Sequence, residues 1–345
     1  MEKFIKLVIF LPRMYLITSK KDKESLEIVK FAADYLKRNK IKFEIDRELK
    51  VELDKNNYEV VISVGDDRFI LETFKKLGKS QIPVFAVASS QSFLAQANSL
   101  NFIYYLNLIK KKKYEVFKRS RLVARFNKIT TPIGLNDIGL FSSKSASLLR
   151  YSLTLNEEVF WKDSSDGVIV ATPTGSTGYS LSAGGPIILD EPNIFTITSI
   201  SSLEKHSSIV VADKTRIKIT DIEGYKPVLV IDGEVRIPIN AKEISVEKSP
   251  YYANFIIFSK EYQLESKLKK RTIIMNIDQL KNLPASSKLI YKILVHEGSM
   301  TQKDLISASV LPERTVRYAL SLLMKRSLIS HQPHFSDARQ TVYSV

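Results

Sequence analysis

The sequence contains no cysteine, which excludes disulfide bonds, thiolate nucleophiles and zinc sites built on cysteine. Histidine is scarce, and we expect no metal site from the four scattered along the chain: His206, His296, His331 and His334. No stretch reaches the roughly 18 consecutive apolar residues that a membrane-spanning helix needs. We therefore expect no membrane partner and a cytoplasmic location.

The amino-terminal residues also lack the pattern of a secretory signal. The apolar run KLVIFL, at residues 6–11, is short, and no small-residue cleavage site follows it. Such a run is more typical of the first strand of a sheet.

Length and charge set the remaining limits. The chain has 345 residues, 44% of them apolar, and a mean hydropathy of −0.07, which suits a globular protein of two or three domains. The net charge is 52 − 37 = +15. This excess indicates a polyanionic partner, which is nucleic acid, nucleotide phosphates or both, unless the lysines only maintain solubility. Composition does not decide between these.

The first 98 residues alternate strand-like and helix-like patterns. Apolar residues recur at helical spacing in 22–37, and apolar runs such as VVISV and VFAVA flank a second helical stretch at 68–77. Strands that alternate with helices through short links form a mostly parallel sheet. We predict an α/β, Rossmann-like domain over 1–98.

The pattern changes after residue 98. Short strand-like runs such as GVIVATP, TRIKITDI and PVLVIDGEV follow one another, separated by glycine, proline, aspartate and asparagine. We predict a β-rich domain over 99–262, followed by a charged linker at 266–271.

The last part of the chain, 272–345, is helical again. Thr301 and Asp304 have the spacing of a capping box, and Pro312 suits the start of the next helix. Two short strand-like runs follow. Three helices and a β-hairpin predict an α+β winged helix-turn-helix domain.

The residues 166–186, DGVIVATPTGSTGYSLSAGGP, contain the most specific pattern. A buried-type strand runs into a turn rich in hydroxyl groups and glycines. Glycine lets the backbone approach a ligand closely, and hydroxyl and N–H groups are partners for a ribose and a diphosphate. Composition alone would also fit an ordinary turn.

This string closely resembles the signature of the NAD kinase family, which reads T-P-T-G-S-T-A-Y and then S-x-S-A-G-G-P. GLND at 134–137 resembles the asparagine-acid motif of the family, and IDGE at 231–234 resembles its D-G-Q turn. The resemblance extends over about 1–262 and implies NAD or NADP as ligand and a homodimer.

The resemblance assigns roles to individual residues. It implies that Asn136 and Asp137 contact the adenosine part of the dinucleotide and that Asp166 binds the ribose or the nicotinamide. It also implies that five further residues line the pocket: Thr174, Thr177, Gly178, Tyr179 and Ser182.

The motif that holds ATP phosphates in the family, G-G-D-G, is altered here to VGDD at 64–67. Gly65 keeps the phosphate-binding position, and Asp66 keeps the position of the base that deprotonates the 2′-hydroxyl. The Asp67 carboxylate is expected to repel a triphosphate by about 4 kcal/mol at 4 Å and an effective dielectric of about 20. Arg68 stands where the family has threonine, and the next motif, AVASSQSFL at 86–94, has lost three glycines.

The carboxy-terminal part carries a basic surplus that fits double-stranded DNA. Residues 281–345 hold nine lysines and arginines and four acidic residues, or +5. Arg314, Arg317 and Tyr318 are expected on the helix face opposite the apolar stripe, and Arg339 is expected in the wing. A winged helix that binds protein, with ordinary surface charges, is the alternative.

Two functions follow. The first is a transcriptional regulator that senses a nicotinamide dinucleotide and binds DNA. The alternative is an active NAD kinase that transfers phosphate from ATP, with Mg²⁺, while the winged helix is an accessory module. An inert scaffold or a subunit of another kinase remains a third option.

Overall fold

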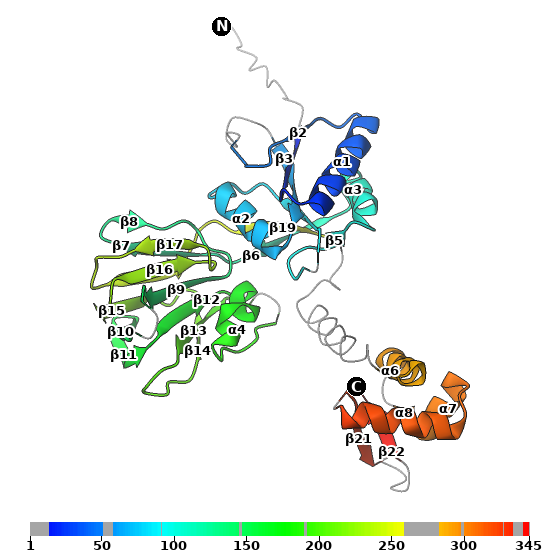
Figure 1. Cartoon of the computed structure of the whole chain (residues 1–345). Coiled ribbons are helices and arrows are strands. Elements are labelled where there is room, and N and C mark those ends of the chain that lie inside the picture. The colour runs from blue at the N-terminus through cyan, green and yellow to red at the C-terminus, as the bar shows by residue number, and fades with distance from the viewer. Residues whose placement is uncertain are drawn as a thin grey trace, which may run out of the picture. The chain divides into compact units, whose positions relative to one another are not determined.

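The computed structural model describes residues 14–50, 58–90, 92–144, 147–189, 192–258, 283–297, 300–326, 328–333 and 341–344. The chain divides into two compact units, residues 1–264 and 265–345 (Figure 1), which are described separately. The apolar run at 6–11, the linker at 266–271 and Arg339 lie outside the described residues. No helix within the described ranges is long and apolar enough to cross a membrane.

The first unit begins with a sheet that is mainly parallel. Its strands are ordered β2-β1-β3-β4-β19-β6, and β5 also pairs with β4. Only β6 is antiparallel to its neighbour. The strands are β1 (Met14–Ser19), β2 (Phe43–Ile45), β3 (Tyr58–Gly65), β4 (Val84–Ala88), β5 (Ala97–Asn98), β6 (Glu115–Arg119) and β19 (Ala253–Ile257). The sheet therefore includes two strands from the range 99–262.

Helices cover both faces of this sheet. Helices α1 (Lys23–Arg38) and α3 (Phe102–Lys110) pack on one face, and α2 (Asp67–Leu77) packs on the other. Asp22 begins α1 by accepting a hydrogen bond from the Ser25 N–H at 2.8 Å. The predicted α/β fold is confirmed.

The rest of the first unit is a β-sandwich. Its two antiparallel sheets are ordered β11-β10-β15-β18-β7-β8 and β14-β13-β12-β9-β16-β17. Apolar residues from both sheets form one shared core, as the alternation of inward and outward side chains requires. The predicted β-rich character is confirmed.

The strands of the sandwich are β7 (Leu122–Phe126), β8 (Ile129–Thr130), β9 (Asp137–Ser142), β10 (Leu149–Leu155), β11 (Glu158–Ser165), β12 (Gly167–Ala171), β13 (Ile194–Ile200), β14 (Ile209–Ala212), β15 (Ile217–Glu223), β16 (Pro227–Ile231), β17 (Val235–Pro238) and β18 (Ile244–Lys248). A 3₁₀ turn, η1 (Thr174–Thr177), and the short helix α4 (Tyr179–Ser182) follow β12.

The described residues of the second unit form helices and a small sheet. Its elements are α6 (Ala285–Glu297), β20 (Met300–Thr301), α7 (Gln302–Ser309), α8 (Glu313–Lys325), β21 (Ser330–Pro333) and β22 (Thr341–Ser344), and the sheet order is β20-β22-β21. The capping box of Thr301 and Asp304 is present at the start of α7. Val316, Leu320 and Leu323 of α8 are buried in the core of this unit.

Candidate functional site

The carboxyl ends of β1 and β3 bring a lysine and an aspartate together. Asp66 follows β3 and begins α2, where its Oδ1 accepts a hydrogen bond from the Phe69 N–H at 2.9 Å. Its Oδ2 forms an ion pair with Lys20, the residue after β1, at 2.6 Å. Ligands of parallel sheets bind at this edge. Gly65 is needed here because a side chain would approach Phe69 to 2.8 Å.

The charge of Asp66 is set by opposing effects. Burial raises the pKa of Asp66, but the hydrogen bonds from Lys20 and the Phe69 N–H outweigh it. The pKa of this carboxyl therefore lies below its ordinary value, and Asp66 is ionised at neutral pH. Lys20 was not predicted from the sequence; its position directly after the first parallel strand was the available signal.

The Asp67 carboxylate points to the segment that follows β4. It accepts hydrogen bonds from the backbone N–H groups of Phe93 and Leu94, at 2.8 and 3.0 Å, and from the Ser92 hydroxyl. Backbone N–H groups stabilise a carboxylate charge. The Asp67 oxygens are thus directed to residues 92–94, and the expected repulsion between Asp67 and a triphosphate stays a prediction.

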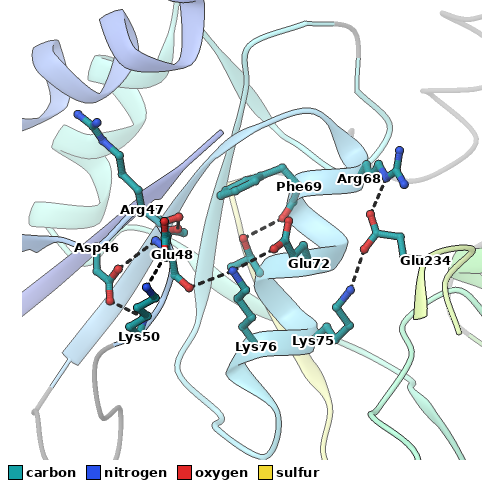
Figure 2. A network of polar contacts seen from close by, with 12 residues as sticks. Asp46, Arg47, Glu48, Lys50, Arg68, Phe69, Glu72, Lys75, Lys76 and Glu234 are labelled. Carbon is teal, nitrogen blue, oxygen red and sulfur yellow. Dashed lines mark hydrogen bonds and ion pairs between the residues drawn. The ribbon is translucent and has the colours of Figure 1, made fainter. Parts of the chain in front are cut away.

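Glu234 connects the sandwich to α2. Figure 2 shows its carboxylate between Arg68 and Lys75, with Oε1 at 2.6 Å from Arg68 Nε and Oε2 at 2.7 Å from Lys75 Nζ. The Glu234 and Lys75 side chains are only 17% and 18% exposed. Burial raises the pKa of Glu234, but the ion pairs with Lys75 and Arg68 lower it by more. The pKa of Glu234 therefore lies below its ordinary value, and the carboxyl is ionised. This role of Glu234 was not predicted from the sequence.

Asp232 lies on the hairpin turn between β16 and β17, which also carries Glu234. Its carboxylate shapes the loop that precedes β9. It is buried, and it accepts hydrogen bonds from the backbone N–H groups of Leu135, Asn136 and Asp137 at 2.7 to 3.2 Å. The loop is thereby fixed, and the Asn136 Oδ1 is buried without a hydrogen-bond partner among the described residues. A buried acceptor of this kind is satisfied by a ligand or by water.

The loop after β12 packs directly on that first loop. The Thr172 N–H donates to the Asn136 carbonyl at 2.9 Å, and the Thr172 hydroxyl donates to the Leu135 carbonyl at 2.7 Å. A side chain at Gly175 would approach the Asn136 carbonyl oxygen to 2.0 Å. Glycine at 175 is therefore required by the close contact of two backbones.

The structure brings most of the predicted dinucleotide residues together. Gly178 lies near the Asn136 amide and the Asp137 carboxyl, since an added Cβ would be 3.8 and 3.9 Å from them. Thr174 is buried and accepts a hydrogen bond from Arg119 at 3.1 Å. Thr177, Tyr179 and Ser182 belong to η1 and α4, in the same turn. The Tyr179 ring is half-exposed.

Asp166 lies apart from this group. It precedes β12, whereas the hydroxyl-rich turn follows the strand, and five residues of strand separate the two ends by roughly 17 Å. The Asp166 side chain is exposed. A single chain therefore does not gather Asp166 with Thr174 and Asn136.

Asp137 is a buried acid beside the turn. Burial raises the pKa of Asp137 to about 7, and the neighbouring charge of Asp232 adds to the effect. Asp137 is thus the group of this loop that changes charge close to neutral pH.

In the second unit, α8 presents Arg314, Arg317 and Tyr318 on its exposed face, opposite Val316 and Leu320. Arg317 forms an ion pair with Glu313 at 2.5 Å, one turn earlier.

Comparisons with known proteins address the first unit. A family model for the ATP-NAD kinase C-terminal domain matches residues 135–258. The chain is 36% identical over 216 residues to an NAD kinase of Clostridium tetani, covering 60% of this chain and 77% of that protein. It is 29% identical over 272 residues to an NAD kinase of Methanothermobacter thermautotrophicus, covering 75% and 95%.

Two solved structures are similar. The crystal structure of an NAD kinase from Archaeoglobus fulgidus in complex with ATP has a TM-score of 0.63 and 27% identity, over 72% of this chain and 95% of that one. Yeast NADH kinase complexed with NADH has a TM-score of 0.64 and 20% identity, over 72% and 84%. The yeast likeness concerns the fold alone.

Proposed function

This chain belongs to the NAD kinase family, and from that membership we propose that it is itself a kinase that transfers phosphate from ATP to the 2′-hydroxyl of NAD. The relatives favour this alternative over the regulator that the altered phosphate motif led us to expect. The similar archaeal kinase structure is a complex with ATP, which supports ATP as the phosphate donor.

The direction of the Asp67 side chain carries the proposal. An Asp67 carboxylate that faced a triphosphate would repel it and oppose phosphoryl transfer. The carboxylate is instead held by Ser92 and by the backbone of 93–94. Its oxygens therefore do not occupy the space beside Asp66, where a phosphate donor would lie.

Asp66 would act as the general base. Its lowered pKa keeps it in the proton-accepting form at neutral pH, and its side chain is 30% exposed, so an incoming hydroxyl has access. Lys20 and Arg68 provide positive charge close to it. Phosphoryl transfer depends on such positioning and charge neutralisation.

Mg²⁺ would arrive with the nucleotide. Within the described ranges, no group of three or more acidic or histidine residues is placed to hold a metal ion. Mg²⁺ is commonly bound by one or two carboxylates together with substrate phosphates, and Asp66 is the carboxylate of this edge that would be near the nucleotide. When bound, the ion neutralises charge on the β- and γ-phosphates.

We assign the dinucleotide, NAD or NADP, to the paired loops of the sandwich. The unpartnered Asn136 Oδ1 is the acceptor that supports this assignment, since a ligand hydroxyl or amino group would satisfy it. The remaining residues of this site are Asp137, Thr174, Thr177, Gly178, Tyr179 and Ser182, and Asp166 is proposed to contact the dinucleotide from the other end of β12.

The test of the kinase is turnover of purified protein with NAD and Mg-ATP, read as NADPH by a coupled dehydrogenase. We expect activity in the wild type and a loss of about 10²- to 10⁴-fold in kcat for Asp66→Asn. Asp34→Asn, at an exposed position of α1, is the matched control and should retain full activity. A wild type that binds NAD but does not turn over would contradict the kinase and favour the regulator or an inert scaffold.

We further propose that the second unit is a winged helix-turn-helix that binds double-stranded DNA, with a homodimer presenting two such helices to two half-sites. The exposed cations and aromatic ring on α8 support this function. The proposed roles of Arg314, Arg317, Tyr318 and Arg339 are contacts to bases or phosphates.

A salt-titrated gel shift of the full chain tests DNA binding. We expect Arg314→Ala to weaken binding and to reduce the slope of log K against log salt by about 1 if it contacts a phosphate. Lys292→Ala, at an exposed position of α6, is the matched control. Absence of binding at low salt would reject the DNA partner.

A further inference from the structure

We propose that Glu234 is a positioning residue that holds the start of α2, and with it Asp66, at a fixed distance from the dinucleotide loop at 134–137. This inference rests on the kinase function proposed above. Glu234 does not touch the reacting atoms in this proposal; it acts through α2.

The hairpin between β16 and β17 closes in a tight turn. Asp232 and Gly233 both have positive φ, at 50° and 72°, and the Glu234 N–H donates to the Ile231 carbonyl at 3.0 Å. This is the geometry of a tight hairpin turn, which allows little bending. Asp232 and Glu234 are thus held at opposite ends of one short turn.

The two carboxylates of this turn contact different parts of the site. Asp232 contacts the loop at 135–137, and Glu234 contacts α2. Asp232 accepts the N–H groups of residues 135–137 and so fixes the dinucleotide loop. Glu234 pairs with Arg68 and Lys75, which lie two turns apart on α2 (Figure 2). The turn therefore connects the loop that would bind NAD to the helix that begins at Asp66.

Glu234 contacts α2 through one shielded ion pair and one exposed ion pair. Its contact with Lys75 is largely shielded from solvent, so this pair is screened less than an exposed one. Arg121 is buried and donates to the Phe74 and Gly78 carbonyls, which fixes the carboxyl end of α2. Glu234 contacts the last turn of α2 through the shielded Lys75, and it contacts the end that carries Asp66 through Arg68, whose side chain is 76% exposed.

Loss of Glu234 should affect phosphoryl transfer more than dinucleotide binding. Phosphoryl transfer needs the 2′-hydroxyl, the base and the donor in line, and an error of about 1 Å can cost about 10²-fold in rate. Dinucleotide binding depends on the loop that Asp232 holds. Loss of Glu234 should therefore lower kcat and leave the affinity for NAD nearly unchanged.

The kinetic experiment compares Glu234→Gln with Glu72→Gln. Glu72 also forms an ion pair from α2, with Lys76 at 2.9 Å, but it does not contact the hairpin. We expect kcat of Glu234→Gln to fall about tenfold or more, with KM for NAD and the calorimetric Kd within about twofold of wild type. Glu72→Gln should behave like wild type. Glu234→Lys alone should lose activity. The double variant Lys75→Glu with Glu234→Lys restores an ion pair of opposite polarity and should recover part of that activity.

A distance measurement makes the test independent of activity. The chain has no cysteine, so Lys79→Cys and Arg236→Cys allow spin labels on either side of the contact. We expect the distance distribution to broaden in Glu234→Gln and to stay narrow in Glu72→Gln. Unchanged distances, or a loss of NAD affinity as large as the loss of kcat, would overturn the inference. A wild type without turnover would contradict the kinase function, while the distances would still decide the role of Glu234.

Discussion

The Asp66 carboxylate lies 2.6 Å from the Lys20 ammonium, across the ends of the neighbouring parallel strands β1 and β3. The pair joins residues 46 positions apart in the chain. It keeps the proposed base ionised and places a cation where phosphate would bind.

Removing Lys20 should change the pH dependence of the kinase. Burial raises the pKa of Asp66 and Lys20 lowers it, so Lys20→Met raises this pKa. A base must be ionised to accept a proton, and the acidic limb of kcat/KM against pH should therefore move to higher pH. Because both side chains are partly exposed, the loss in unfolding free energy should stay below about 1 kcal/mol.

The control for this variant is Lys21→Met, which removes the neighbouring exposed ion pair with Glu48. Its pH profile should match that of the wild type. A Lys20→Met profile that does not move would show that Lys20 has no electrostatic influence on the base.

Asp137 should make stability fall with rising pH. Its folded-state pKa of about 7 exceeds the value of about 3.9 for an unfolded aspartate, so protonation favours the folded state. This contribution is present below pH 4 and is lost as the pH rises through about 7. Between about pH 5 and pH 7 we expect the unfolding free energy of the first unit to fall by roughly 1 kcal/mol per pH unit.

Urea unfolding at several pH values measures this slope, and Asp137→Asn should reduce it. Burial also raises the pKa of the adjacent Asp232, which contributes with the same sign. The pKa values of Asp66 and Glu234 are lowered, so their opposite contribution arises at more acidic pH and does not mask the effect. An equal slope in Asp137→Asn would assign the titration to another group.

Two glycine substitutions in one loop should differ sharply. A Cβ at Gly175 would meet the Asn136 backbone at 2.0 Å, whereas at Gly178 the closest atom is the Gly175 carbonyl oxygen at 3.2 Å. We expect Gly175→Ala to lose about 3 kcal/mol of stability and most of its NAD affinity, because the two loops must separate. Gly178→Ala should cost less than about 1 kcal/mol. Calorimetry with NAD and thermal unfolding compare the two, and similar losses would contradict the packing argument.

Val310 should be a point of strain in the second unit. It ends α7 in the left-handed region, with φ 55° and ψ 24°, and it is 88% exposed. Left-handed geometry is costly for a β-branched side chain and suits glycine. Val310→Gly should raise the unfolding free energy of this unit by about 1 kcal/mol. In a thermal melt of the full chain, the transition of this unit should move to higher temperature. Val310→Ala keeps a Cβ and should gain less; an equal gain would place the cause elsewhere.

Much of the architecture was predictable from local patterns. The alternation of strands and helices before residue 98 and the short strands after it predicted the two kinds of sheet, because periodicity reports which face of an element is buried. The string at 166–186 predicted the loop that packs on Asn136. The buried face of α8 and the capping box at Thr301 also follow from spacing within one helix.

The contacts that decide the site could not be read in this way. The sequence placed Asp67 next to Asp66 and predicted repulsion, but the fold turned its carboxylate to Phe93 and Leu94, 26 and 27 residues away. Asp166 belonged to the same string as Thr174, yet a whole strand separates them.

Neighbouring residues were sufficient to predict the class of fold, the family and the loops that carry hydroxyls and glycines. The pairing of the charges depends on how the chain folds. Glu234 meets Arg68 across 166 positions and Lys75 across 159. Such pairs form because folding brings a strand hairpin against a helix, and no local spacing encodes that approach.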